Sequence, residues 1–489
     1  MSDRSRRLRP RSRRLRAVLV VLVLAIAAAA LGGYLYERAR TGSIYHPHAP
    51  FLSQATPTLP DNGKRFSWPI YGYTQNHTRY FPGPPFLRPP FKQLWVHNAH
   101  ALLEFPPVIY GDHIFQLADD AVLSAINIHT GHTFWTQHLG KVSASSPAVT
   151  ADAVYVTILA SGHPHKPGRI VALDYRTGTV RWFRSLPSPS ESSPLLDKGR
   201  LFFGSQNGTV YALDAHNGRV IWTYHASGSV KASPTLSGGV LYFGDYSGHV
   251  QAISEATGRR IWRSSSEGAL LGSGTFYSTA AVVYGRVFLG NTDGRVYAYD
   301  AATGKLDWAV QTGAFVYSSP AVTNAPGLGP TIYLGSYNDT FYAFNARTGH
   351  IRWRFKAGGR ISGSATIIGD VVYFADLGEH RTYGLGISTG RLLFRMNTGA
   401  FDPVISDGRD IYLTGFTGLY GLAPILPAKP ATSAAKPRTK CTSHRHRKHG
   451  SAKSAPQPAQ CRHRAAAPRS SHHKRARHSH SRKRASSSG

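Results

Sequence analysis

The chain has 489 residues, a formal net charge of +32 and two cysteines, Cys441 and Cys461. So few cysteines exclude a small disulfide-stapled fold, and the length suits a large domain with its own hydrophobic core. The charge gathers at the two ends: residues 1–16 carry +7 and residues 428–489 carry +17, which leaves +8 for the residues between them. The strong basicity is therefore a property of the ends and not of the central region.

The first predicted element is an apolar helix. Residues 17–36 contain no charged side chain, and 20 helical residues span about 30 Å, the thickness of a bilayer core. Because the arginine-rich residues 1–16 precede it, the positive-inside rule places them in the cytoplasm. We expect an uncleaved signal-anchor that crosses a bacterial cell membrane once, with the rest of the chain extracytoplasmic. A signal peptide cleaved after Ala28–Ala30 is the alternative.

An internal repeat follows a proline-rich stretch, residues 37–65, that is predicted to be a linker. In seven copies a small residue is followed ten positions later by an aromatic one, across a turn ending in glycine, as from Ala212 through Gly218 to Trp222. The spacing of 40 to 47 residues is typical of one four-stranded propeller blade per repeat. The repeated aromatic residues are Trp95, Trp135, Trp182, Trp222, Trp262, Trp308, Trp353 and Phe394.

This pattern resembles the tryptophan-docking motif of the pyrroloquinoline-quinone-type propeller repeat. The family includes the quinoprotein dehydrogenases and, with the greater resemblance, the propeller lipoprotein of the outer-membrane barrel-assembly machinery. The resemblance covers residues 66–425 and implies that each repeated aromatic residue packs between neighbouring blades. The segment Trp68–Tyr80 is similar to the lead-in that precedes the first blade in this family, and we expect it to cap the propeller.

We predict an all-β, eight-bladed propeller over residues 66–427. The segment after Phe394 supplies only three strands, at residues 403–406, 410–414 and 419–422, and the missing fourth is expected at Phe91–Val96. A ring closed by strands from both ends of the domain leaves no open sheet edge. Seven blades is the alternative if the last copy does not pair.

The innermost strand of each repeat begins near a small-residue pair, most often Ser-Pro as at Ser146-Pro147. Side chains just before this pair should converge on the central channel from every blade, so a binding site is expected there. A channel opening lined by such side chains suits a small ligand or a peptide. The candidate channel-mouth residues are Glu104, Glu191, Lys231, Tyr277, Tyr317 and Asp402.

The same residues have a simpler interpretation. Polar side chains around a wide channel can do no more than contact water, and Glu191 and Lys231 can simply pair with each other. The repeated serines are expected to bond to backbone near the proline, and none has the histidine partner that nucleophilic catalysis needs. We assign no catalytic residue and no metal site.

The resemblance also bears on cofactors. Quinoprotein alcohol dehydrogenases of this family hold pyrroloquinoline quinone (PQQ) with a disulfide between adjacent cysteines and a calcium site of Glu, Asn and Asp. This chain has no adjacent cysteines. We therefore expect no cofactor and no enzymatic activity, with a PQQ- and calcium-dependent oxidoreductase as the alternative.

The last predicted region is a tail, residues 428–489, of alanine, serine, proline, histidine and basic residues. It has no apolar periodicity, which predicts disorder. Its charge favours nonspecific, salt-dependent binding to anionic envelope polymers. No aromatic residue is interleaved to stack on bases, so sequence-specific nucleic-acid binding is not expected. In an oxidising compartment Cys441 and Cys461 could close a loop or join two chains.

These elements predict a membrane-anchored extracytoplasmic propeller that acts as a protein- or ligand-binding scaffold in the cell envelope. The first alternative is the oxidoreductase described above. The second is a polyanion-binding protein that acts mainly through its tail.

Overall fold

A computed structural model describes residues 11–40, 42–45, 50–52, 65–165, 167–267, 274–401 and 404–426. The candidate residue Asp402 and the whole predicted tail lie outside these residues. The one described helix, α1, spans Arg11–Arg40. Over the described residues, no helix combines the length and apolarity that crossing a membrane requires. The signal-anchor at residues 17–36 therefore stays a prediction.

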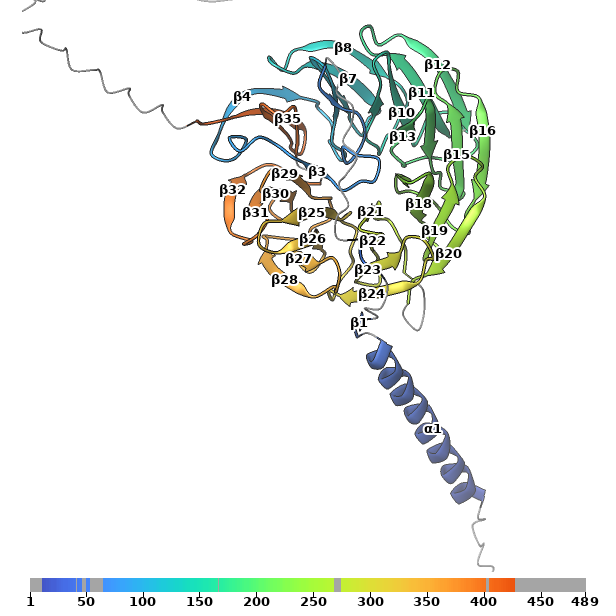
Figure 1. Cartoon of the computed structure of the whole chain (residues 1–489). Coiled ribbons are helices and arrows are strands. Elements are labelled where there is room, and N and C mark those ends of the chain that lie inside the picture. The colour runs from blue at the N-terminus through green and yellow to red at the C-terminus, as the bar shows by residue number, and fades with distance from the viewer. Residues whose placement is uncertain are drawn as a thin grey trace, which may run out of the picture. The chain divides into compact units, whose positions relative to one another are not determined.

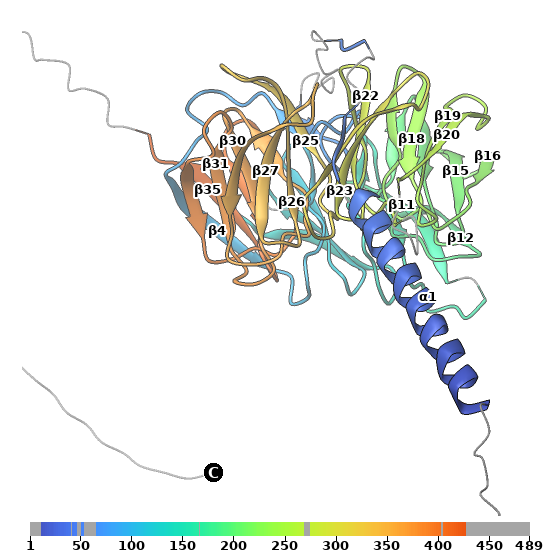
Figure 2. The same ribbon diagram turned by 90° about the horizontal axis from the view of Figure 1, so that it is seen from below.

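The described strands form eight sheets around a central axis, seen along that axis in Figure 1 and from the side in Figure 2. Each blade has four antiparallel strands, from the hub outwards. Blades 1 to 4 contain β5 (Val108–Tyr110), β6 (His113–Leu117), β7 (Val122–Asn127) and β8 (Thr133–His138); β9 (Ala148–Val149), β10 (Ala153–Ile158), β11 (Gly168–Asp174) and β12 (Val180–Leu186); β13 (Leu195–Asp197), β14 (Arg200–Phe203), β15 (Thr209–Asp214) and β16 (Val220–His225); and β17 (Thr235–Ser237), β18 (Val240–Gly244), β19 (His249–Ser254) and β20 (Arg260–Ser265).

Blades 5 to 8 repeat this order. They contain β21 (Ala281–Val283), β22 (Arg286–Gly290), β23 (Arg295–Asp300) and β24 (Leu306–Gln311); β25 (Ala321–Ala325), β26 (Gly329–Ser336), β27 (Thr340–Asn345) and β28 (Ile351–Lys356); β29 (Thr366–Ile368), β30 (Val371–Ala375), β31 (Thr382–Gly386) and β32 (Leu392–Met396); and β33 (Val404–Ser406), β34 (Ile411–Thr414), β35 (Gly418–Pro424) and β4 (Phe91–Asn98).

The second and third strands of the blades carry most of the core. In blade 3, β14 and β15 are almost wholly buried, while the outermost strand β16 alternates between half-buried and exposed residues. The small residue of each repeat lies opposite the aromatic one, as Ala212 lies opposite Trp222, and the register shifts directly after it. A small residue here leaves room for the indole ring on the neighbouring strand.

Each of the seven repeated tryptophans contacts the next blade in the same way. The indole N–H of Trp182 donates to the carbonyl oxygen of Ala215 at 3.1 Å, and the ring lies on Gly218. Gly218 has a φ of +70°, and a Cβ there would come within 2.6 Å of the ring, so the turn requires glycine. The same hydrogen bond joins Trp95 to Ile128, Trp135 to Tyr175, Trp222 to Glu255, Trp262 to Ala301, Trp308 to Ala346 and Trp353 to Ile387.

The ring closes as predicted, with eight blades and not seven. Strand β4, from the start of the domain, pairs antiparallel with β35, from its end, with Trp95 opposite Gly421. Because β35 and β4 come from opposite ends of the domain, no turn links the third and fourth strands of blade 8. Phe394 of blade 7 therefore has no turn of this kind to contact, and packs edge-on against Phe91, with ring centroids 5.5 Å apart.

The predicted linker contains structure that its composition does not indicate. Strand β1 (Ile44–Tyr45) pairs with β24 and adds a fifth strand to the outer edge of blade 5. Phe51 then stacks on Tyr284 at 5.3 Å, and the N–H of Leu52 donates to the Tyr284 carbonyl oxygen. Residues 44–45 and 50–52 therefore follow blade 5 from its outer strand to its innermost hairpin.

Candidate functional site

The hub is closed by a short segment that we call the plug, residues 67–81. Its two strands, β2 (Ser67–Trp68) and β3 (Tyr80–Phe81), pair with the innermost strands of blades 1 and 7. Plug carbonyl oxygens also accept hydrogen bonds from the innermost strands of blades 2, 4, 5, 6 and 7, in ring order. The pairs are Pro69 with Val149, Gln75 with Leu236, Asn76 with Val282, Thr78 with Val322, and Arg79 with Ile367.

Three residues of the plug have a strained backbone conformation. Tyr73, His77 and Arg79 all have φ between +50° and +72°, a region that side chains other than glycine rarely occupy. The Nδ1 atom of His77 lies 2.8 Å from the Thr235 hydroxyl of blade 4, and the Arg79 guanidinium lies over the Tyr71 ring. The expectation that Trp68–Tyr80 caps the propeller agrees with these contacts.

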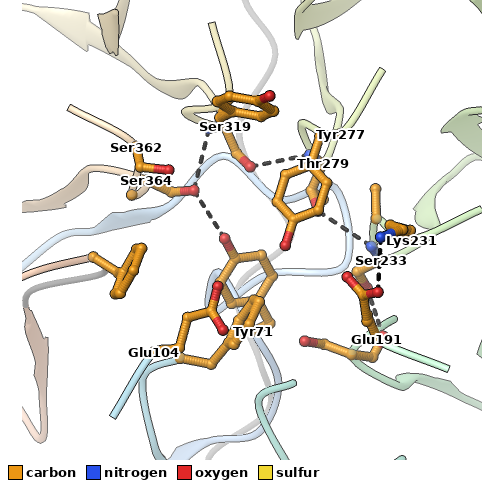
Figure 3. A pocket seen from close by; sticks show the side chains of 16 residues that line it. Tyr71, Glu104, Glu191, Lys231, Ser233, Tyr277, Thr279, Ser319, Ser362 and Ser364 are labelled. Carbon is orange, nitrogen blue, oxygen red and sulfur yellow. Dashed lines mark hydrogen bonds and ion pairs between the residues drawn. The ribbon is translucent and has the colours of Figure 1, made fainter. Parts of the chain in front are cut away.

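At the other end of the innermost strands, a pocket opens inside the ring (Figure 3). Its walls are the segments that lead into the innermost strands, and its floor is Tyr71 of the plug, whose hydroxyl lies 2.9 Å from the Ser364 hydroxyl. Five of the six candidate residues line it, and Asp402 is not described. The lining includes Glu104, Glu191, Lys231, Tyr277, Tyr317 and Ser362.

A belt of hydroxyl groups holds these lead-in segments in place. The N–H of Ser319 donates to the Ser364 hydroxyl of the next blade at 3.1 Å. Equivalent bonds join Ser146 to Ser193, Ser233 to Thr279, and Thr279 to Ser319. The hydroxyls of these serines also donate to backbone carbonyl oxygens near the prolines, as predicted: Ser146 donates to Pro106 at 2.6 Å, and Ser233 to Ser193 at 2.8 Å. This arrangement fixes the spacing of the pocket walls.

One ion pair dominates the electrostatics of the pocket. The Lys231 Nζ atom lies 2.8 Å from Glu191 Oε1 and 4.9 Å from the centre of the Tyr246 ring, so the pairing of these two side chains is confirmed. Burial raises the pKa of Tyr277 well above its ordinary value, and the charges of Glu104 and Glu191 raise it further. The phenol is therefore neutral at physiological pH, in a region of negative potential.

The pocket has little space beyond its open mouth in this conformation. Its volume is about 40 Å³, or about 490 Å³ when the space open to solvent at its mouth is included, whereas ligand pockets usually enclose roughly 300–1,000 Å³. Within the described residues, no three His, Cys, Asp or Glu side chains gather closely enough to hold a metal ion.

Three aromatic residues of the lining were not among the predicted site residues: Tyr71, Phe105 and Phe401. Phe105 directly follows Glu104, and Phe401 directly precedes Asp402, so a wider window around the candidate residues could have found them. Tyr71 belongs to no repeat, and only the expectation of a cap pointed towards it.

A second hollow, of about 610 Å³, lies at the opposite ends of the innermost strands. Its lining includes Gln75 of the plug, Leu52 and the carboxyl groups of Asp197 and Glu255. Both carboxyl groups have partners, because Gln75 donates to Asp197 at 2.8 Å and Arg200 lies 2.6 Å from Glu255. This hollow therefore presents no acid without a partner to a ligand.

Comparisons with known proteins agree with this geometry. The family model described as outer membrane protein assembly factor BamB matches residues 92–196, 166–319 and 317–415. Among solved structures, BamB from Moraxella catarrhalis is 18% identical, with 68% of this chain and all of that chain covered and a TM-score of 0.56. No curated protein matches the sequence.

Enzymes share the fold at similarly low sequence identity. A europium-containing methanol dehydrogenase is 13% identical over 73% of this chain and 98% of its own, with a TM-score of 0.61. The quinohemoprotein alcohol dehydrogenase from Comamonas testosteroni is 14% identical over 74% and 81%, with a TM-score of 0.60. At such low identity these likenesses establish the propeller fold alone.

Proposed function

We propose, from the premise that this chain belongs to the family of the outer membrane protein assembly factor BamB, that it is a non-enzymatic scaffold of the cell envelope. In this proposal the channel mouth docks a partner protein, and the pocket receives one projecting group of that partner. The observation that carries it is the convergence of Glu104, Glu191, Lys231, Tyr277 and Tyr317 on one pocket with a closed floor.

The size and construction of the pocket favour docking over catalysis. An inner volume of about 40 Å³ suits the end of one side chain of a docked partner. Lys231 and Glu191 already satisfy each other at 2.8 Å, so neither is poised as an acid or a base for a bound substrate. A quinone-dependent oxidoreductase is the second candidate, because the fold is shared with such enzymes.

The sequence supplies the rest of the proposal. Residues 17–36 would anchor the chain in a bacterial cell membrane, with the propeller on the extracytoplasmic side. Residues 428–489, with a charge of +17, would hold anionic envelope polymers by salt-dependent contacts. Deleting the tail should then reduce polymer binding while leaving partner docking at the mouth intact.

The test is site-specific photocrosslinking of the full chain in cells. A photoreactive residue at Tyr317 or Ser362, on the mouth, should crosslink the same partner protein, while one at Phe183, on the outer strand of blade 2, should not. Crosslinks from Phe183 alone would reject docking at the mouth. In parallel, native mass spectrometry with PQQ and calcium should show no stoichiometric mass shift, and a shift with a quinone absorbance band would establish the oxidoreductase.

A further inference from the structure

Four tyrosines form a continuous arc around one side of the channel mouth. They come from blades 4, 5 and 6, in the order Tyr246, Tyr277, Tyr317 and Tyr337. Successive ring centroids lie 6.3, 5.6 and 4.9 Å apart, so the rings form one aromatic surface that crosses three blades. Figure 3 shows Tyr277, one of the two middle tyrosines, beside the pocket.

Each end of this tyrosine arc already holds a positive group of the chain itself. The Lys231 ammonium lies 4.9 Å from the centre of the Tyr246 ring. The Arg360 guanidinium lies 5.9 Å from the centre of the Tyr337 ring. The faces of electron-rich rings attract cations at such distances. The arc therefore has the chemistry of a cation-binding surface at both of its ends.

The middle of the arc lines the pocket and is more negative than its ends. Among the residues that line the pocket, Glu104 and Glu191 carry negative charge and Lys231 alone carries positive charge. Burial raises the pKa of Tyr277, and Glu104 contributes more to this rise than Glu191 does. The Tyr277 and Tyr317 rings meet edge to face, so a cation would lie beside them in the pocket, where it would gain from both the rings and the carboxylates.

We propose that the channel mouth recognises a lysine or arginine side chain in an extended segment of the partner protein, with its charged head in the pocket beside Tyr277 and Tyr317. This inference rests on the proposed docking function and names the chemistry of the docked group. The narrow pocket takes the end of one side chain, and the rest of the tyrosine arc, with Phe315 at its exposed edge, contacts the neighbouring residues of the segment.

The test is a ligand-observed NMR titration of the full chain with three blocked pentapeptides. They have alanine throughout except for a central lysine, arginine or norleucine, the last having the apolar length of lysine without its charge. We expect the lysine and arginine peptides to bind at least tenfold more tightly than the norleucine peptide, with the difference shrinking at high salt. Equal binding of all three would overturn the inference.

Variants identify the site. Glu104→Gln and Tyr317→Leu should each weaken binding of the lysine peptide at least fivefold, whereas Tyr317→Phe, which keeps the ring, should weaken it less than twofold. The matched control is Phe183→Leu, because that ring also lies beneath a cation, Arg169, but on the outer strand β12. Unchanged binding in folded Tyr317→Leu protein would reject the site.

The two proposals fail separately. If the partner crosslinks at Tyr317 and the peptides bind without charge selectivity, docking at the mouth stands and the cation inference is wrong. If the lysine peptide binds selectively and the partner crosslinks only at Phe183, the mouth is a cation site but not the docking face.

Discussion

Between neighbouring blades the same contact is made seven times, whereas the equivalent positions at the hub differ from blade to blade. Every tryptophan contact joins an indole N–H to a carbonyl oxygen of the next blade and lays the ring on a turn glycine, as with Trp182 and Gly218. At the hub, aligned positions carry glutamate, alanine, lysine, tyrosine or serine. We therefore expect the repeated contact to supply stability and, in the proposed function, the varied hub positions to supply specificity.

The sharpest way to test the repeated contact is to remove its most buried member. Trp308 is 1% exposed and donates to the carbonyl oxygen of Ala346. Trp308→Ala should lower the free energy of unfolding by about 3–5 kcal/mol, measured by urea denaturation followed by circular dichroism. A loss below about 1 kcal/mol would mean that the tryptophan contacts are not the main joint between blades.

The turn glycine is the other half of this contact. Gly218→Ala should cost about 2–4 kcal/mol, because its positive φ strains alanine and the added methyl group meets the Trp182 ring. Gly199 is the control, since its φ is +74° but no atom lies within 4 Å of a Cβ placed there. Gly199→Ala should cost only about 1 kcal/mol. Equal losses would assign the whole effect to backbone strain.

The stability of the protein should depend on pH through one histidine of the plug. Burial, and next the charge of Arg79, hold the pKa of His77 well below its ordinary value, so the ring stays neutral in the folded protein. The unfolded chain takes up this proton near pH 6.5. Stability should therefore fall as the pH drops below about 6.5, by up to about 1.4 kcal/mol per pH unit from this group. His77→Gln should flatten the slope between pH 6.5 and 5, and an unchanged slope would remove His77 as its source.

The smallest effect concerns the one copy without tryptophan. Because blade 8 has no turn between its third and fourth strands, Phe394→Trp should add no more than about 0.5 kcal/mol. The reverse change in the preceding blade, Trp353→Phe, should cost about 0.5–1.5 kcal/mol. It removes the indole hydrogen bond to the Ile387 carbonyl oxygen, which keeps the Tyr333 hydroxyl as a donor. A clear gain from Phe394→Trp would show that the indole does not need the turn.

The repeat itself made the ring predictable. The spacing of the aromatic residues and the shortage of strands after Phe394 led to eight blades closed by Phe91–Val96, and the structure extends that strand only to Asn98. Five channel-mouth residues were also placed together from their position before the small-residue pairs. In these cases one residue per blade recurs at the same position of each repeat. The repeats of this one sequence can therefore be aligned with each other.

What the sequence could not provide lies outside the repeat. The hydrogen bonds of the plug use backbone carbonyl groups, for which side-chain identity gives no signal. Positive φ at Tyr73 and His77 contradicts the usual preference of such residues and is held by tertiary contacts. The pairing of Ile44–Tyr45 with β24 joins residues more than 260 positions apart, and so short a strand has no periodicity to detect.

The plug also limits how this protein could change over evolutionary time. Propellers gain or lose blades when a segment encoding one repeat unit is duplicated or deleted. Here the carbonyl groups of Gln75, Asn76, Thr78 and Arg79 meet blades 4, 5, 6 and 7 one after another. An extra or missing unit would put every later blade out of step with its carbonyl group. The hydrogen bonds of the fifteen plug residues thus fit a ring of eight blades. A ninth blade could be added only if the sequence of this segment changed at the same time.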